Sequence, residues 1–424
     1  MLQIVINVIG IITTVLLSYQ IVYALIGLFT RPRRFENGGD HRFAVLVSAR
    51  NEEAVLAGLL DSLHHQTYPS DKIDLYVVAD NCADRTADIA RSFGATVLER
   101  HDAAHIGKGY ALNFLLHYIR SEKGDDFYDG FLVFDADNVV EPNYIEEINK
   151  TFSNGYRIVT SYRNSKNFGA NWITSGYGIW FLREARSLNH PRMLVGSSCA
   201  VSGTGFLFHR DILKMHDGWN FFLLTEDIQF SVASILKGEK IGYCHDAVFY
   251  DEQPTSFRQS WNQRLRWARG ILQVFGHYSG HLFCGIFRNK YKNRFAHYDL
   301  FVTVLPLAAI TLFTMLCILA NAIEAAVQFG TIGFWNHMMS AVISLVSAYG
   351  MFMLMAIVVL LTEWRMIRCS TPRKLLSVFT FPLFMLLWIV VGIIVLFRKV
   401  QWVPIQHSVN VSVDEIKNDA PRSE

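Results

Sequence analysis

Charged residues are scarce in this sequence, and the shortage limits what kind of protein it encodes. Of its 424 residues only 18% are charged, whereas 51% are hydrophobic and the mean hydropathy is +0.22. Soluble domains carry about a quarter charged residues, so an ordinary soluble enzyme is excluded. The apolar residues concentrate at the N-terminus and beyond residue 299, which predicts membrane spans on either side of a soluble middle region.

Several familiar site patterns are also missing. The six cysteines form no C-x-x-C pair and no zinc-like spacing, which favours unpaired, reduced thiols. No G-x-G-x-x-G sequence follows the first predicted strand, and this argues against a cytosolic dinucleotide-binding enzyme. The formal net charge is only +2, so nothing in the charge balance indicates a nucleic-acid partner.

The first apolar run has the properties of a membrane anchor. Residues 2–29 contain no charge, are too long for a signal-peptide core, and are followed by the basic sequence R-P-R-R at residues 31–34. The positive-inside rule then places the N-terminus outside and the following residues in the cytoplasm.

Three further apolar runs follow the middle region, at residues 300–323, 339–362 and 375–397. The linker 364–374 carries four basic residues and no acid, so we expect it to be cytoplasmic and the two runs before it to form a hairpin. If the last run crosses fully, the tail ends outside, yet Arg398 and Lys399 favour the inside. A re-entrant or interfacial piece broken at Pro382 resolves the conflict, and both topologies remain open.

The middle region alternates between strand-like and helix-like patterns. This alternation predicts a parallel, doubly wound α/β sheet, whose ligands bind at the carboxyl ends of the strands. The expected strands are 42–49, 73–80, 95–100 and 130–137, and the expected helices are 51–66, 84–94 and 108–120.

Asp135 and Asp137 follow a buried-strand pattern, and carboxylates there require compensation. Such a pair suits Mg²⁺ or Mn²⁺, which one or two carboxylates and substrate phosphates usually hold. The alternative is a purely structural role at a strand-to-turn junction, where aspartate is common. An isolated D-x-D favours that alternative.

Two other side chains stand at comparable positions. Asp80 ends a predicted strand and could accept hydrogen bonds from a base or ribose, or it could simply cap a turn. Lys108 lies in a G-K-G sequence before a helix, where it could meet a phosphate or remain a solvated lysine.

Glu226 and Asp227 follow Thr225 after an apolar run. A carboxylate beside an acceptor hydroxyl can act as a general base. The alternative is plain charge in the first turn of a helix capped by Thr225, where acids favour the helix dipole.

Gln263, Arg266 and Trp267 form a Q-x-x-R-W pattern. Arginine binds phosphate through charge-assisted hydrogen bonds, and tryptophan offers a flat face to a sugar. From Arg258 to Arg294 there are eight lysines or arginines and no acid, which also suits contact with anionic lipid headgroups.

In this order, the motifs resemble those of the membrane-embedded family 2 glycosyltransferases, which include cellulose, hyaluronan, poly-N-acetylglucosamine and chitin-oligosaccharide synthases. The resemblance covers essentially the whole chain. The sequences that carry it are SARNEE, VVADNCADRT, GKGYALN, FDADN, SGTGFLF, TED and QRLRW. The chain lacks an F-x-V-T-x-K loop and a PilZ-like module, which argues against a cellulose synthase under cyclic-dinucleotide control.

The resemblance implies a GT-A-type Rossmann-like cytoplasmic domain flanked by transmembrane helices, and it implies a role for each motif. The implied catalytic residues are Asp227 and Glu226. Nucleotide-sugar contacts fall on Asn51, Glu52, Asp80, Lys108, Asp135, Gln263 and Arg266. Acceptor contacts fall on Trp267, Ser202, Gly203 and Thr204, and the metal ligands are Asp137 and Asp135, for Mg²⁺ or Mn²⁺.

The resulting hypothesis is an inverting, processive hexosyltransferase of the plasma membrane that elongates a β-linked polysaccharide from UDP-N-acetylglucosamine or UDP-glucose. The alternative is transfer of one or two sugars to a lipid acceptor, and an accessory export or regulatory subunit fits either. A transporter or membrane scaffold is disfavoured, because the span cores carry almost no charge apart from Glu324. The expected organisation is an anchor at 1–30, a catalytic domain at 40–270, a basic interfacial segment at 271–298, a membrane region at 299–400 and a polar tail at 401–424.

Overall fold

The centre of the molecule is one eight-stranded sheet, with strand order β3-β2-β1-β4-β7-β6-β8-β5. The computed structural model describes residues 2–288, 293–401 and 403–418. Lys290 and Lys292 of the basic stretch, and the last six residues of the expected tail, lie outside the described residues. The strands are β1 (Phe43–Ala49), β2 (Ile73–Asp80), β3 (Thr96–Arg100), β4 (Gly130–Asp135), β5 (Val139–Val140), β6 (Ile158–Ser165), β7 (Phe206–His209) and β8 (Ile241–Asp251).

The first half of the sheet confirms the predicted strands. β1 pairs in parallel with β2 and β4, and β2 pairs in parallel with β3. The second half corrects the expectation of a wholly parallel sheet, because β7 is antiparallel to both β4 and β6. β7 has only four residues and follows a long helical excursion, so the βαβ pattern of the first half does not extend to it.

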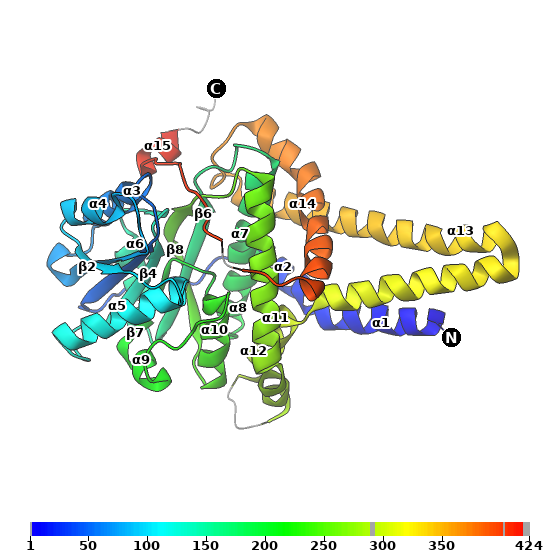
Figure 1. Ribbon diagram of the computed structural model, residues 1–424, viewed down its shortest axis with the longest axis horizontal. Helices are drawn as coiled ribbons and strands as arrows, with labels where there is room; N and C mark the ends of the chain where they lie inside the picture. Colours follow the sequence, from blue (N-terminus) through cyan, green and yellow to red (C-terminus); the bar gives the residue numbers. More distant parts are fainter. Residues whose placement is uncertain (1, 289–292, 402, 419–424) are drawn as a thin grey trace.

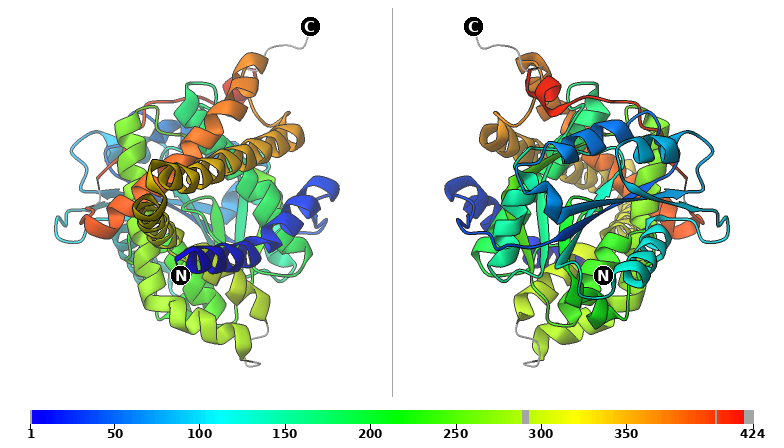
Figure 2. Two further views of the ribbon diagram at one scale, coloured as in Figure 1. Left: turned by 90° about the vertical axis from the view of Figure 1, so that its right-hand side faces the viewer. Right: turned by 90° about the vertical axis from the view of Figure 1, so that its left-hand side faces the viewer.

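Helices cover both faces of the sheet, as the two end-on views of Figure 2 show. α5 packs on β1 and β2, and α6 packs on β6 and β8. The helices between and after the strands are α3 (Leu56–His64), α4 (Thr86–Ser92), α5 (Lys108–Lys123), α6 (Tyr144–Ser153), α7 (Trp172–Glu184), a π-helical turn (Ala185–Asn189), α8 (His190–Leu194), α9 (Arg210–His216), α10 (Glu226–Leu236), α11 (Phe257–Phe287) and α12 (Arg294–Val304), with a 3₁₀ turn at Ser70–Lys72.

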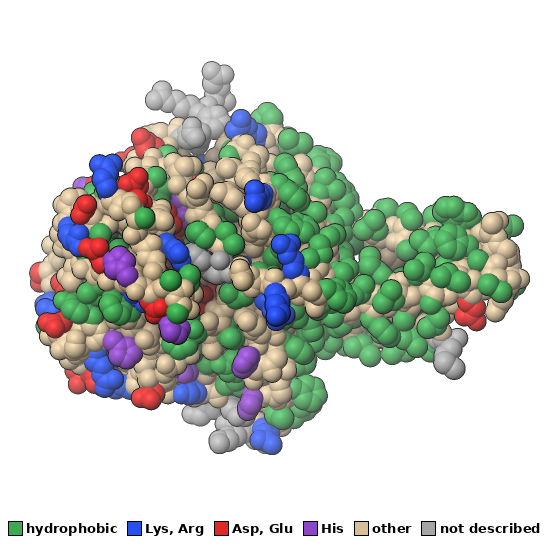
Figure 3. Space-filling view, viewed as in Figure 1, with side chains coloured by type: hydrophobic (Ala, Val, Ile, Leu, Met, Phe, Trp, Pro, Cys, Tyr) green, Lys and Arg blue, Asp and Glu red, His purple; other side chains and the backbone are tan. Residues whose placement is uncertain are grey.

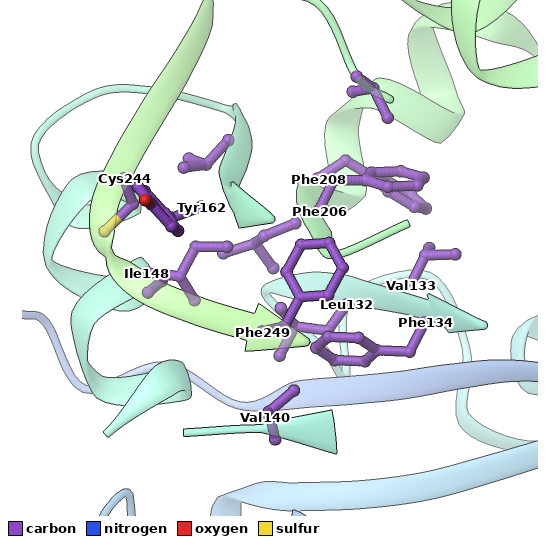
Figure 4. Close-up of a cluster of buried hydrophobic side chains, with 14 of the residues drawn as sticks. Leu132, Val133, Phe134, Val140, Ile148, Tyr162, Phe206, Phe208, Cys244 and Phe249 are labelled. Carbon is purple, nitrogen blue, oxygen red and sulfur yellow. The ribbon is translucent and has the colours of Figure 1, made fainter. Parts of the chain in front are cut away.

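The core of this domain lies on either side of β4. Leu132, Val133 and Phe134 are fully buried, although successive side chains point to opposite faces. Figure 4 shows these residues beside Phe206 and Phe208 of β7. A central strand covered on both faces reads as a continuous apolar run rather than an alternating one, which explains why the sequence before Asp135 is uniformly hydrophobic.

Apolar helices project from one side of the domain. α1 (Leu2–Leu17) and α13 (Leu307–Glu363) extend away from it (Figure 1), and α13 turns back on itself at Gly330, where φ is 65°. α2 (Tyr19–Phe29) instead packs against the π-helical turn and α8. The two arms of α13 form the expected hairpin and extend beside α1 (Figure 1). Hydrophobic side chains dominate the projecting part, whereas charged ones gather on the α/β domain (Figure 3). Leu2–Phe29, Leu307–Glu363 and Thr371–Phe397 are long and apolar enough to cross a membrane.

α14 (Thr371–Phe397) does not extend with the hairpin. It runs across the flank of the α/β domain (Figure 1) and packs against α7 and α11 as well as against α13. Of the two topologies left open by the sequence, the one with a piece broken at Pro382 does not match the structure, because one continuous helix contains this residue. Near the start of α14, the Arg373 guanidinium donates to the carbonyl oxygen of Gly169 at 2.7 Å, and toward its end Val391 and Val395 pack on Leu265. A short helix, α15 (Val413–Asn418), follows.

Candidate active site

The loops after β1 and β2 meet at the carboxyl edge of the sheet. Asn51 and Asn81 leave these strands in the left-handed conformation, with φ of 55° and 53°, which asparagine tolerates better than most residues. The Asn51 side-chain oxygen accepts a hydrogen bond from the Ala83 amide at 2.8 Å. This contact fastens the two loops together and places Asn51 beside the loop that follows Asp80.

Asp80 is a buried carboxylate with a dedicated partner. Its Oδ1 accepts from the Arg100 guanidinium at 2.6 Å and from the Asn81 amide at 3.0 Å. Arg100 ends the neighbouring strand β3 and was not among the residues expected from the sequence. A turn cap is therefore an inadequate description of Asp80, because its charge is held in place by an ion pair across two strand ends.

Lys108 joins three segments of the site. It is the first residue of α5, its ammonium forms an ion pair with Asp135, and it donates to the carbonyl oxygen of Gly203 at 2.9 Å. Its side chain is only 14% exposed, so the solvated-lysine alternative is wrong. The positive charge lies where β4 ends, beside the S-G-T-G sequence.

Asp135 and Asp137 differ in accessibility. The Asp135 side chain is 37% exposed, whereas Asp137 is 3% exposed and its Oδ2 accepts from the Glu252 amide at 3.1 Å. Carboxylate oxygens are the ligands that Mg²⁺ and Mn²⁺ prefer. Among the described residues no group of three or more His, Cys, Asp or Glu side chains forms a closed metal site. The two carboxylates could hold such an ion only together with ligands from a substrate, such as phosphate oxygens.

The S-G-T-G loop lies directly beside this pair. The Thr204 hydroxyl accepts from the Asp135 amide at 2.8 Å, and the Ser202 hydroxyl donates to Glu184 at 3.4 Å. Gly203 has φ of 79°, and a Cβ built there would lie 4.0 Å from an Asp227 oxygen. The loop thus connects the D-x-D end of β4 with the start of α10.

Glu226 and Asp227 open α10 and are only partly buried. Burial raises the pKa of both carboxyls above the ordinary range, and each lies close enough to Lys108 for its charge to oppose the rise. Thr225 occupies the N-cap position, but its buried hydroxyl has no hydrogen-bond partner within the described residues. The helix-cap alternative therefore does not account for the T-E-D sequence.

The Q-x-x-R-W residues share one face of α11, as their i, i+3, i+4 spacing requires. Gln263 Oε1 and Arg266 Nε are buried and lack a hydrogen-bond partner among the described residues. Arg266 is also close enough to lower the pKa of Glu226. The Trp267 ring stacks on Trp388 of α14, with ring centres 6.3 Å apart and an interplanar angle of 12°, so one of its faces is already covered.

The sequence did not indicate the contribution of the C-terminal tail. His407 Nδ1 lies 3.0 Å from both carboxylate oxygens of Glu52, and its neighbours contact Glu252. Burial by itself would lower the pKa of His407, but Asp137, Glu52 and Glu252 together raise it to about 10. A histidine in a polar tail after the last apolar run carries no local signal of such a position.

The family model described as "Glycosyltransferase like family 2" matches residues 41–270, more than half of the chain. The chain belongs to this family. The site assembled above is its candidate active site. The matched residues lie within the segment 40–270, whose assignment as a separate catalytic domain stays a prediction.

Known relatives include synthases that are named for different products. The chain is 26% identical to the probable glycosyltransferase YdaM of Bacillus subtilis, over 61% of each chain. It is 28% identical to beta-monoglucosyldiacylglycerol synthase of Nostoc sp., over 60% of this chain and 54% of that one. It is 26% identical to poly-beta-1,6-N-acetyl-D-glucosamine synthase of Staphylococcus epidermidis, over 60% and 63%. The chain thus spans about three fifths of the length of these relatives.

A solved structure shares the fold. The mannosyltransferase PcManGT from Pyrobaculum calidifontis, in complex with GDP-Man and Mn²⁺, superposes with a TM-score of 0.60 at 16% identity, covering 93% of this chain and 98% of that one. The catalytic domain therefore has a GT-A-like fold with a mixed sheet, accompanied by helices apolar enough to span a membrane.

Proposed function

We propose that the protein is an inverting glycosyltransferase that uses UDP-N-acetylglucosamine or UDP-glucose to elongate a β-linked polysaccharide at the cytoplasmic face of the plasma membrane. The observation that carries the proposal is the convergence of Lys108, Asp135 and Asp227 around Gly203. One crevice then contains the Lys108 ammonium, which can bind a diphosphate, the Asp135 carboxylate, which can bind a metal, and the Asp227 carboxylate, which can act as a base.

The donor would lie along the carboxyl edge of the sheet. Asp80, fixed by Arg100, and the Asn51 loop would contact the uracil and ribose. Lys108 and Arg266, whose Nε has no hydrogen-bond partner among the described residues, would face the diphosphate. Asp137 and Asp135 would hold Mg²⁺ or Mn²⁺, which stabilises the charge of the leaving diphosphate when bound. PcManGT, a mannosyltransferase of the same fold, is known in complex with Mn²⁺.

Asp227 would act as the general base. The acceptor hydroxyl gives its proton to the Asp227 carboxylate, its oxygen bonds to the anomeric carbon, and the bond from that carbon to the UDP oxygen breaks. Attack opposite the leaving group inverts the anomeric centre. Glu226, whose pKa burial also raises, would share the charge at this end of α10 and limit how easily both carboxyls ionise together.

The acceptor would enter between the S-G-T-G loop and Trp267. The Q-x-x-R-W pattern favours a processive polymerase with a growing glycan as acceptor. A second candidate is transfer of one or two sugars to a membrane lipid. It is favoured by the likeness to beta-monoglucosyldiacylglycerol synthase and by the few helices that project with α1 and α13.

The test uses the full chain purified in nanodiscs with Mg²⁺ or Mn²⁺ and a panel of UDP-sugars. UDP release is followed, and the product is sized before and after glycosidase digestion. A long, glycosidase-sensitive product supports the polymerase, and a lipid carrying one or two sugars supports the second candidate. Release of no UDP from any donor, in the presence of membrane lipids and glycan primers, would contradict both.

A further inference from the structure

The loop that joins α9 to α10, residues 217–225, lies between α5 and α11. Its inner side is fixed by Trp219 and Phe221, which are 1% and 3% exposed and pack on the Phe230 ring with centres 5.1 and 5.2 Å apart. Its end is fixed on α11, where the Leu224 amide donates to a side-chain oxygen at 3.2 Å. The remaining side of the loop faces α5.

Three contacts join this loop to the first two turns of α5. The rings of Tyr110 and Phe222 stack with centres 4.5 Å apart and an interplanar angle of 16°. The Asn113 side-chain amide donates to the Trp219 carbonyl oxygen at 2.8 Å. A Cβ built at Gly109 would overlap a carbonyl oxygen of the loop, so the two backbones approach as closely as glycine allows. The loop and the helix therefore meet along a continuous line of contacts.

Core packing does not account for the stack. The Phe222 side chain is 39% exposed, whereas its neighbour Phe221 is buried and already holds the loop against the core. Aromatic rings stack within a narrow range of offsets and angles. The stack of Tyr110 on Phe222 therefore fixes where the loop lies relative to α5, in addition to the attachment that Phe221 provides.

This contact lies between the proposed diphosphate contact and the proposed base. Lys108 precedes Tyr110 by two residues on α5, and Asp227 follows Phe222 by five residues in the first turn of α10. The Lys108 ammonium donates to the Gly203 carbonyl oxygen at 2.9 Å, and a Cβ at Gly203 would lie 4.0 Å from an Asp227 oxygen. Displacement of a reacting group by about 1 Å can lower a rate about 100-fold. The separation between Lys108 and Asp227 is therefore a distance that the loop has to maintain.

The Tyr110 ring also adjoins the proposed nucleoside contact. Arg100, which pairs with Asp80, donates to the His105 carbonyl oxygen at 2.8 Å and to the Asp102 carboxylate at 3.0 Å. The His105 Nδ1 lies 3.0 Å from the same Asp102 oxygen. The His105 and Tyr110 ring centres are 5.2 Å apart. An unbroken series of contacts thus runs from Asp80 to the loop before α10.

We propose that Tyr110 is a positioning residue that couples the seating of the nucleotide to the placement of the Asp227 base, through its stack with Phe222. The inference rests on the proposed function, since it concerns the same donor site. A nucleotide that engages Asp80 and Lys108 holds both ends of the segment that carries Tyr110. The stacked rings then hold the loop, and the start of α10 behind it, in a fixed position relative to the diphosphate.

The first measurement is hydrogen–deuterium exchange of the full chain in nanodiscs, with and without UDP and Mg²⁺. In the wild type UDP should slow amide exchange at the start of α5 and in residues 217–225. In Tyr110→Ala UDP should still protect α5 but no longer the loop. UDP affinity should fall roughly 5-fold, because coupling between two sites is reciprocal. Tyr110→Phe keeps the ring and should behave as the wild type, and His117→Ala, at an exposed position of the same helix, is the control.

The second measurement tests whether the two rings act as one unit. At saturating donor, Tyr110→Ala and Phe222→Ala should each lower kcat roughly 10- to 100-fold. The double variant should be no worse than the more impaired single variant, because both changes remove the same contact. Tyr110→Leu, which keeps apolar volume without the ring, replaces the alanine variant if that variant does not fold.

Three results would overturn the inference. The first is UDP protection of residues 217–225 that persists in Tyr110→Ala. The second is a pair of losses in kcat that add in the double variant. The third is a lower thermal midpoint of Tyr110→Ala with unchanged kcat, which would show that the stack only stabilises the fold.

The two proposals fail in different ways. Loop protection by UDP that requires Tyr110, without sugar transfer from any donor, would leave the Tyr110 assignment standing and remove the proposed function. Normal transfer by a wild type whose loop exchange does not respond to UDP would remove the Tyr110 assignment and leave the proposed function intact. Absence of UDP binding would remove both.

Discussion

α13 and α14 are nearly alike in composition and different in their surroundings. Their most apolar windows have mean hydropathies of 2.3 and 2.7, but only 11% of the α13 window is buried within the protein, against 44% for α14. The first projects as a hairpin and the second lies against the catalytic domain (Figure 1). Hydropathy identifies an apolar helix, but it does not determine whether lipid or protein will surround that helix.

The catalytic domain provides α14 with a fitted surface. The Arg264 side chain of α11 donates to the Phe384 carbonyl at 2.9 Å and lies over the Phe384 ring at 3.5 Å. Gly176 of α7 has no side chain where Phe384 packs. By contrast, Phe313, Val327 and Trp335 on the arms of α13 are more than half exposed.

This difference matters for the active site, because α14 leads into the tail that carries His407. Trp388 of α14 also covers one face of Trp267. The helix with the most apolar window is thus the one that contacts Trp267 and leads to His407.

The largest expected effect is the loss of sugar transfer on substitution of Asp227 in the crevice, and the effects of changes at α14 are compared with it. Asp227→Asn should leave UDP binding nearly unchanged and lower transfer about 10²- to 10⁴-fold, the usual contribution of general base catalysis. UDP release and UDP binding are measured side by side. Asp217→Asn, at an exposed position, is the control, and wild-type turnover by Asp227→Asn would refute the base assignment.

Breaking the contact between α11 and α14 should have the next largest effect. Arg264→Ala removes a buried, charge-assisted hydrogen bond and should cost about 1.5–3 kcal/mol of stability, with faster tryptic cleavage in the tail. The thermal midpoint and the cleavage rate in nanodiscs report this loss. Arg258→Ala on the exposed side of the same helix should change neither, and equal effects of the two changes would show that α14 is not seated through Arg264.

Substitution of one glycine that faces α14 and one glycine within α13 compares the packing around the two helices. A Cβ at Gly176 would lie 2.4 Å from Phe384, whereas one at Gly350 of α13 meets nothing within 4 Å. Gly176→Ala should therefore destabilise the protein by about 1–3 kcal/mol, and Gly350→Ala should stabilise it by about 0.5–1 kcal/mol. Thermal midpoints that shift in the same direction would break the distinction between α13 and α14.

The smallest effect concerns pH. Burial raises the pKa of Asp227, and a base works only when ionised, so activity should fall with decreasing pH through a value above the ordinary range for aspartate. The acid limb of kcat against pH measures this value. In Glu226→Gln the acid limb should move to lower pH, because loss of the neighbouring negative charge lowers the pKa of Asp227. An acid limb of the wild type at the pKa of a free aspartate would contradict the assignment.

Much of the first half of the fold could be predicted from local pattern. Strands β1 to β4 and the helices between them fall where apolar runs and turn residues indicate, and Asp80, Asp135 and Lys108 lie at their ends as expected. The antiparallel β7 could not be predicted in this way, because strand direction depends on the pairing partner rather than on its four residues.

The residues of the candidate site could also be predicted only in part from the sequence. Residues next to one another in a motif carry their own signal, as Glu226 and Asp227 do. The partners Arg100 and His407 carry none, because each is defined by a contact with a residue at least 20 positions away in the chain.

The sequence by itself determined the family, the strand ends at which the acids stand and the apolar character of α13 and α14, since these follow from composition and short-range spacing. Only the tertiary structure decided that α14 lies on the catalytic domain and that His407 reaches Glu52 and Asp137. Those outcomes depend on shape complementarity and long-range electrostatics between distant segments, which no local pattern contains.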